Sequence, residues 1–230
     1  MQCRIICDFD GTIALEDVTD TLLERFALPE WRSIEDDWKA GRIGSRECML
    51  RQVALLRAAP EQIDRCLDQV AIDPGFPRFV ATAAKLGCEL LVVSDGLDYA
   101  IRRVLGRFGL DHLPIMANRL ELTGTDRWRL GFPHASDNCA KGSGTCKCAI
   151  ATRNGGEARL RVLIGDGASD FCAATSVHMV FAKDRLLDHC RANALPHVGF
   201  TGFAEVGRLL ADLVAKPTAT MTPALELERV

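Results

Sequence analysis

The 230-residue sequence has little tyrosine, no excess of positive charge and no long apolar run. It contains one Tyr, and its 28 Lys and Arg are outnumbered by 31 Asp and Glu, which gives a net charge of -3. Nucleic-acid binding usually requires a basic, aromatic-rich face, so this composition argues against a nucleic-acid partner. No apolar stretch approaches ~20 residues, so we expect no membrane span.

The sequence also gives no sign of a signal peptide, because a predicted strand starts within its first residues. Its ten cysteines are scattered through predicted strands and helices of a chain far larger than a disulfide-stabilised mini-domain. We therefore expect mostly reduced thiols and a cytoplasmic protein. Hydrophobic residues at 48% and charged residues at 26% are typical of a folded protein.

Two acids, Asp8 and Asp10, directly follow the apolar run 3–7 and precede Gly11 and Thr12. A short apolar run that ends on acids and a glycine indicates a buried strand leading into a loop. With a period of two along a strand, Asp8 and Asp10 face one side and Phe9 the other. Carboxylates this close repel each other unless a cation joins them, and Mg²⁺ is the usual cation for oxygen ligands.

The rest of the chain predicts an α/β fold. Helical periodicity from about residue 17 to 70, interrupted by Pro29, Gly41–Gly44 and Pro60, indicates about four helices. Helices and strands then alternate, which predicts a doubly wound, Rossmann-like parallel sheet. We expect helices at 77–86, 99–108, 146–152 and 203–214, strands at 88–93, 115–122, 160–164 and 177–182, and a hairpin partner at 127–130. The predicted divisions are a catalytic core of 1–14 and 75–215, a small helical cap of 15–74 inserted after the first strand, and a loose tail of 216–230.

Further polar residues follow the later strands or begin a helix, where the carboxyl ends of parallel strands would bring them together. They are Ser94 with Asp95 and Gly96, then Lys147, and finally Asp166 with Asp170. Lys141 could supply the positive charge of this set in place of Lys147, but it lies in a Gly- and Ser-rich loop. Lys147 begins a predicted helix, whose N-terminus favours a phosphate, so we choose Lys147.

This ordered set of motifs resembles the haloacid dehalogenase superfamily of phosphatases. The resemblance implies that Asp8 is the nucleophile that forms an aspartyl-phosphate and that Asp10 is the general acid and base. It implies a Mg²⁺ ion held by Asp8, Asp10 and Asp166, with Asp170 holding a metal-bound water or bracing the lysine. It also implies phosphate binding by Lys147, Gly11 and the segment Ser94, Asp95 and Gly96.

A narrower resemblance is to the phosphoserine-phosphatase-like group and, within it, to the methionine-salvage phosphatases of 2-hydroxy-3-keto-5-methylthiopentenyl-1-phosphate. The segments 26–31, 138–147 and 181–187 carry it. The salvage family tends to have Gly after the serine that corresponds to Ser94, whereas this chain has Asp95. In this respect the chain resembles the phosphoethanolamine/phosphocholine phosphatases. An acid beside the phosphate favours an amine substrate. Asp17 matches an amine-binding acid of phosphoserine phosphatases and equally suits the N-cap of a helix.

We therefore expect a Mg²⁺-dependent phosphatase of a small phosphorylated metabolite, as a monomer or homodimer. The favoured substrate is the methionine-salvage compound 2-hydroxy-3-keto-5-methylthiopentenyl-1-phosphate, and the alternatives are phosphoserine, phosphoethanolamine and phosphocholine. Transfer of the phosphoryl group to another alcohol is a further alternative, as is a non-enzymatic metabolite-sensing module on the same fold. His134, Cys139, Cys146 and Cys148 crowd one loop, where plain thiols, a redox pair and a zinc site are the options.

Overall fold

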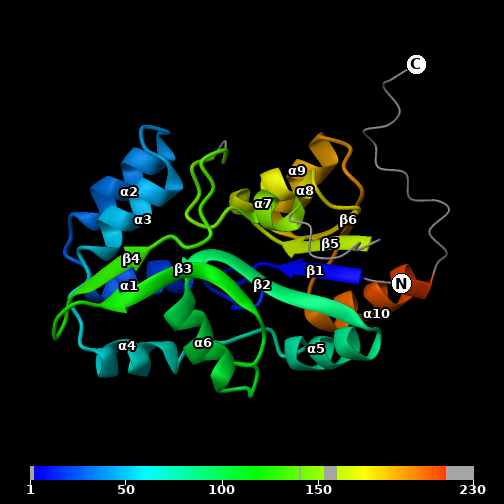
Figure 1. Ribbon diagram of the computed structural model, residues 1–230, viewed down its shortest axis with the longest axis horizontal. Helices are drawn as coiled ribbons and strands as arrows, with labels where there is room; N and C mark the ends of the chain where they lie inside the picture. Colours follow the sequence, from blue (N-terminus) through cyan, green and yellow to red (C-terminus); the bar gives the residue numbers. More distant parts are fainter. Residues whose placement is uncertain (1–2, 140, 153–159, 216–230) are drawn as a thin grey trace. The chain divides into compact units, whose positions relative to one another are not determined.

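The computed structural model describes residues 3–139, 141–152 and 160–215. Seven strands form one sheet in the order β4-β3-β2-β1-β5-β6-β7 (Figure 1). They are β1 (Cys3–Cys7), β2 (Cys88–Leu97), β3 (Ile115–Leu122), β4 (Trp128–Gly131), β5 (Leu160–Gly165), β6 (Met179–Ala182) and β7 (His197–Gly199). β2 pairs with β3, β5 with both β1 and β6, and β6 with β7 in parallel, whereas β3 and β4 are antiparallel. This mostly parallel sheet with flanking helices confirms the predicted α/β fold.

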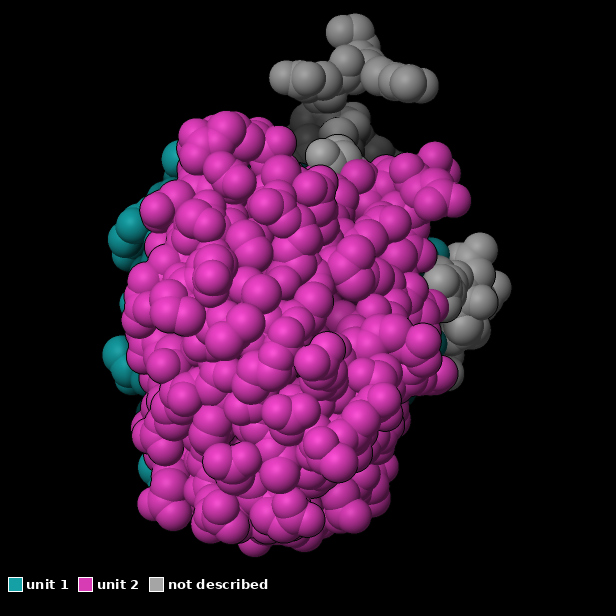
Figure 2. Space-filling model, turned by 90° about the vertical axis from the view of Figure 1, so that its left-hand side faces the viewer, with its two compact units in different colours: residues 1–13, 72–91, 147–230 teal, residues 14–71, 92–146 magenta. Residues whose placement is uncertain are grey.

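The chain divides into two compact units (Figure 2). The first comprises residues 1–13, 72–91 and 147–230, and the second comprises residues 14–71 and 92–146. The predicted core and cap boundaries group residues 92–146 differently, so a separate cap of 15–74 stays a prediction. Among the described residues, no helix has both the length and the apolar character needed to cross a membrane. The expected tail of 216–230 lies outside the described residues.

In the first unit, helices cover both faces of β1, β5, β6 and β7 (Figure 1). One face carries α5 (Phe76–Lys85) and α10 (Phe203–Ala215), and their aromatic rings meet, with Phe76 and Phe203 4.8 Å apart between centroids. The other face carries α7 (Lys147–Thr152), α8 (Phe171–Ala174) and α9 (Asp184–Ala192). This double cover explains why Ile5 and Ile6, which point to opposite faces of β1, are both fully buried.

The second unit contains α1 (Val18–Phe26), α2 (Trp31–Lys39), α3 (Ser45–Val53) and α4 (Pro60–Leu67), which match the four helices expected between 17 and 70. It also contains α6 (Asp98–Gly106), which packs on β3. The indole N–H of Trp128 on β4 donates to the Ala58 carbonyl at 2.8 Å, so it ties the β3–β4 hairpin to the segment before α4.

Four elements were not predicted: η1 (Ala168–Asp170), α8, α9 and β7. The first two are only 3 and 4 residues long, α9 buries only Leu186 and Cys190, and β7 consists of three half-buried residues. Such short or weakly periodic segments lack the repeated apolar pattern on which sequence reasoning depends. The helix expected at 146–152 begins at Lys147, and β2 continues past the expected end at residue 93 to Leu97.

Candidate active site

The carboxylate of Asp8 is fixed at the end of β1. The Asp8 N–H donates to the Ile164 carbonyl on β5 at 2.9 Å, which continues the parallel β1–β5 ladder. The Phe9 N–H donates to Asp8 Oδ1 at 2.8 Å, and the Phe9 side chain is fully buried. Asp8 is only 5% exposed, so its carboxylate is held on a rigid strand end with little access to water.

The turn after Asp8 needs a glycine at position 11. Gly11 has a φ of +67°, and a Cβ built there would lie 2.5 Å from Asp166 Oδ2. The turn is closed by the Thr12 and Ile13 N–H groups, which both donate to the Phe9 carbonyl. Half-buried Asp10 lies within this turn. Gly11 therefore supplies both the left-handed backbone and the space that the Asp166 carboxylate occupies.

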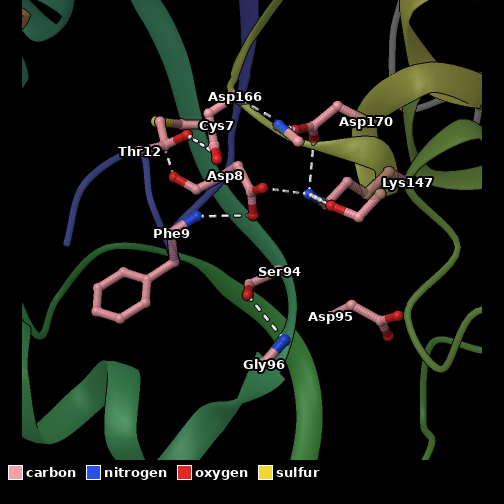
Figure 3. Close-up of polar contacts among 12 residues, drawn as sticks. Cys7, Asp8, Phe9, Thr12, Ser94, Asp95, Gly96, Lys147, Asp166 and Asp170 are labelled. Carbon is pink, nitrogen blue, oxygen red and sulfur yellow. Dashed lines mark hydrogen bonds and ion pairs between the residues drawn. The ribbon is translucent and has the colours of Figure 1, made fainter. Parts of the chain in front are cut away.

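Lys147, the first residue of α7, points between two carboxylates (Figure 3). Its Nζ lies 2.7 Å from Asp8 Oδ2 and 2.7 Å from Asp170 Oδ1, and it donates to Ser169 Oγ at 2.9 Å. These contacts use all three ammonium N–H groups. Burial by itself lowers the pKa of Lys147, but the attraction of Asp170 and Asp8 outweighs it and raises this pKa, so Lys147 stays charged.

Two more acids follow β5. Asp170 is fully buried, and its Oδ2 accepts the N–H groups of Asp166 and Gly167 at 3.3 Å each. Asp166 Oδ1 accepts the Thr12 hydroxyl at 2.7 Å. Burial raises the pKa of Asp166, while the Thr12 hydrogen bond opposes that rise. The β5 end is thereby held to the turn after β1.

The chemistry of this cluster fits a divalent cation. Ligand atoms of Asp8, Asp166 and Asp170 lie within 4.8 Å of one another, and no other group of three or more His, Cys, Asp or Glu side chains among the described residues is this close. Burial and then Asp170 raise the pKa of Asp8 well above its ordinary value, although Lys147 opposes them. When all three acids are ionised, one ammonium leaves two excess negative charges, which a hard oxygen-binding cation such as Mg²⁺ would balance. The sequence also left a zinc site open at His134, Cys139, Cys146 and Cys148. Among the described residues, these four side chains do not bring their ligand atoms as close together as the three acids do.

We predict that Gly11→Ala weakens metal binding by about 10- to 100-fold, because the new Cβ displaces Asp166. The matched control is Gly87→Ala. Gly87 has the same φ of +67°, but nothing lies within 4 Å of a Cβ built there. Both variants carry the backbone strain, and only Gly11→Ala should lower Mg²⁺ affinity in calorimetric titration. Equal affinities in the two variants would contradict this account of Gly11.

The second predicted motif lies in the second unit, at a bulge in β2. Val93 pairs with Met116 and Leu97 with Asn118, so Ser94, Asp95 and Gly96 lie opposite a single residue of β3. The Gly96 N–H donates to the buried Ser94 Oγ at 2.8 Å (Figure 3). Bulges of this kind turn side chains out of a regular strand and are frequent beside active sites.

The structure thus brings Asp8, Lys147, Asp166 and Asp170 together within the first unit. Asp17 caps α1, with its carboxylate accepting the Asp20 N–H at 2.9 Å, as one of its two predicted roles requires. Sequence reasoning assigned no role to Thr12 or Ser169, which hold Asp166 and Lys147. Thr12 lies in the motif of residues 8–12 and Ser169 in the motif of residues 165–170. Their hydroxyl groups, placed beside the acids, were the feature from which these roles could have been predicted.

The comparison with known families agrees with this geometry. A family described as haloacid dehalogenase-like hydrolase matches residues 5–175. The chain therefore belongs to the haloacid dehalogenase-like hydrolases.

Particular relatives narrow the class. The chain is 33% identical over 212 residues to the 2-hydroxy-3-keto-5-methylthiopentenyl-1-phosphate phosphatase of Brevibacillus brevis, with 91% of this chain and 95% of the relative covered. The enzyme of the same name from Geobacillus thermodenitrificans is 33% identical over 208 residues, covering 89% and 94%. A phosphoserine phosphatase with a phospho-aspartyl intermediate analogue has a similar fold, with a TM-score of 0.67, 20% identity and 90% and 97% coverage. These relatives confirm the predicted phosphatase class.

Proposed function

We propose that this protein is a Mg²⁺-dependent phosphomonoesterase that forms an aspartyl-phosphate at Asp8, with 2-hydroxy-3-keto-5-methylthiopentenyl-1-phosphate as its substrate. The observation that carries the proposal is the buried Asp8 carboxylate, held by Lys147 at 2.7 Å beside two further acids. The names of the relatives at 33% identity support the substrate.

In the first step, an Asp8 oxygen attacks phosphorus and the bond to the leaving oxygen breaks. Asp10 gives its proton to that oxygen. In the second step, water attacks phosphorus, Asp10 takes the proton, and the bond to Asp8 breaks to release inorganic phosphate. Lys147 favours the ionised form of Asp8, and the Phe9 N–H fixes the rotation of the carboxylate. Gly11, Ser94 and Gly96 keep their predicted role in holding the phosphoryl oxygens.

Asp8 and Asp166 would hold the metal, together with Asp10 as the resemblance implies, and Asp170 braces Lys147 at 2.7 Å. The bound ion would neutralise negative charge between the nucleophile and the phosphate.

The contacts of Asp95 favour the enol phosphate over an amine substrate. Both Asp95 carboxylate oxygens accept hydrogen bonds from the protein, Oδ1 from Asn118 and Thr145 and Oδ2 from Ser45. An ammonium group would have to displace or share these donors. The departure at Asp95 is therefore explained without an amine substrate.

Phosphate release in Mg²⁺ should be measured with the salvage enol phosphate, phosphoserine, phosphoethanolamine and phosphocholine. We expect the highest kcat/KM for the enol phosphate. A higher kcat/KM for one of the three amine substrates would contradict the proposed substrate but would leave the proposed mechanism intact. A folded, Mg²⁺-binding protein that hydrolyses none of the four would favour the sensing module, and a phosphorylated alcohol formed from added acceptor would favour phosphoryl transfer.

We also predict that Mg²⁺ raises the melting temperature more at pH 8 than at pH 5. Burial raises the pKa of Asp8 and of Asp166, so these acids ionise in the folded protein only at a higher pH than in the unfolded chain. Without metal, stability therefore falls as pH rises through this interval, and bound Mg²⁺ removes the penalty. Thermal unfolding with Mg²⁺ and with EDTA at each pH tests this, and an equal shift at both would contradict it.

A further inference from the structure

Asp95 joins three segments of the second unit that are distant in sequence. Its Oδ2 accepts the hydroxyl of Ser45, the first residue of α3, at 2.6 Å. Its Oδ1 accepts the Thr145 N–H at 2.9 Å and the Asn118 amide at 3.1 Å, and its carbonyl accepts the same amide at 2.5 Å. Thr145 then donates its hydroxyl to Asn118 Oδ1 at 3.1 Å, which closes a ring of polar contacts.

The Thr145–Asn118 side of this ring is buried and tightly packed. Asn118 is fully buried and Thr145 is 1% exposed, so the hydrogen bond between them is shielded from water, whereas Ser45 and Asp95 are half-buried. Gly144 leaves no room for a side chain, because a Cβ would lie 2.5 Å from Asn118 Oδ1 and 2.6 Å from the Phe132 ring. The segment before α7 therefore has one well-defined path, and Asp95 binds its backbone directly.

We propose that Asp95 is a positioning residue that fixes the segment carrying Lys147. One residue, Cys146, separates Thr145 from Lys147, and its N–H donates to the His134 carbonyl at 3.1 Å. The two peptide groups before the lysine are thus both anchored, Thr145 by Asp95 and Cys146 by His134. The role in catalysis rests on the proposed function, whereas the anchoring is a property of the fold.

Asparagine at position 95 separates positioning from charge recognition. Its Oδ1 can still accept from Thr145 and Asn118, and its Nδ2 can donate to the Ser45 hydroxyl, so the ring survives without the negative charge. Alanine removes both the ring and the charge. A positioning role therefore predicts that Asn rescues what Ala loses, whereas an amine-binding role predicts that both variants fail alike.

The experiment compares Asp95→Ala, Asp95→Asn and, as control, the exposed Asp36→Ala on α2. We expect Asp95→Ala to lower kcat by about 100-fold with little change in KM, because misplacing the lysine impairs chemistry more than binding. Asp95→Asn should stay within about threefold of the wild type, and Asp36→Ala should match it. Asn118→Ala should lower kcat as well, and combining it with Asp95→Ala should add little.

Amide hydrogen exchange gives a readout that does not depend on the substrate. The Thr145 and Cys146 amides should lose protection in Asp95→Ala and keep it in Asp95→Asn. Unchanged protection in Asp95→Ala, or equal loss of kcat in both variants, would overturn the positioning role. A wild type that hydrolyses no phosphomonoester would instead overturn the proposed function, while the exchange data would still decide the anchoring.

Discussion

Asp8→Asn is expected to lower phosphate release by at least about 10⁴-fold, since an amide cannot act as the nucleophile and catalytic groups that act as a unit give losses of this size. The protein should remain folded, because the change removes one of three carboxylates that lie close to one another. Burial and Asp170 raise the pKa of Asp8, so the loss of its charge relieves repulsion.

The measurement is phosphate release under saturating substrate, together with acid-quench trapping of labelled phosphoenzyme. The wild type should trap label and Asp8→Asn should not. Asp188→Asn is the matched control, because the Asp188 side chain is 80% exposed and forms only a surface ion pair with Arg191. A variant at position 8 that keeps a tenth of the activity would rule out Asp8 as the nucleophile.

Lys147→Met is expected to reduce the free energy of unfolding by about 3–5 kcal/mol in the absence of metal. The Lys147 side chain is 1% exposed and lies 2.7 Å from each of two carboxylates, which the variant would leave buried without a counter-charge. Activity should fall as well, because Asp8 would be less ionised. Urea unfolding in EDTA measures the loss.

Two variants test the reason for this loss. Lys147→Met combined with Asp170→Asn should recover part of the stability, because one uncompensated carboxylate is gone. Lys141→Met changes the other candidate lysine, which is exposed, and should alter the free energy of unfolding by no more than about 0.5 kcal/mol. If Lys141→Met destabilises the protein as much as Lys147→Met, the choice between the two lysines is wrong.

The sequence was sufficient for the parts of the site that follow a general rule. Asp8, Asp166 and Asp170 come after apolar runs and Lys147 begins a helix, so the rule that strand ends converge predicted their proximity. The contacts of Asp95 could not be predicted in this way. Its partners lie 50 residues away at Ser45 and Thr145 and 23 away at Asn118, and no local periodicity relates these positions. From the sequence alone, Asp95 beside the phosphate-binding Ser94 suggested that it binds an amine substrate. In the structure, its hydrogen bonds to other parts of the chain give Asp95 a role in the fold instead.

The pairing of β1 with β5 also has a consequence during synthesis. Thr12 and Asp166, which close the site, are 154 residues apart, and the nucleophile meets its lysine only after most of the chain has been made. At the usual rate of translation, roughly 8 to 30 s pass between the synthesis of β1 and that of its partner strand β5. A nascent or truncated chain that stops before β5 would contain Asp8 and Lys147 but would lack Asp166 and Asp170. It would be catalytically silent and would expose an apolar strand edge to chaperones.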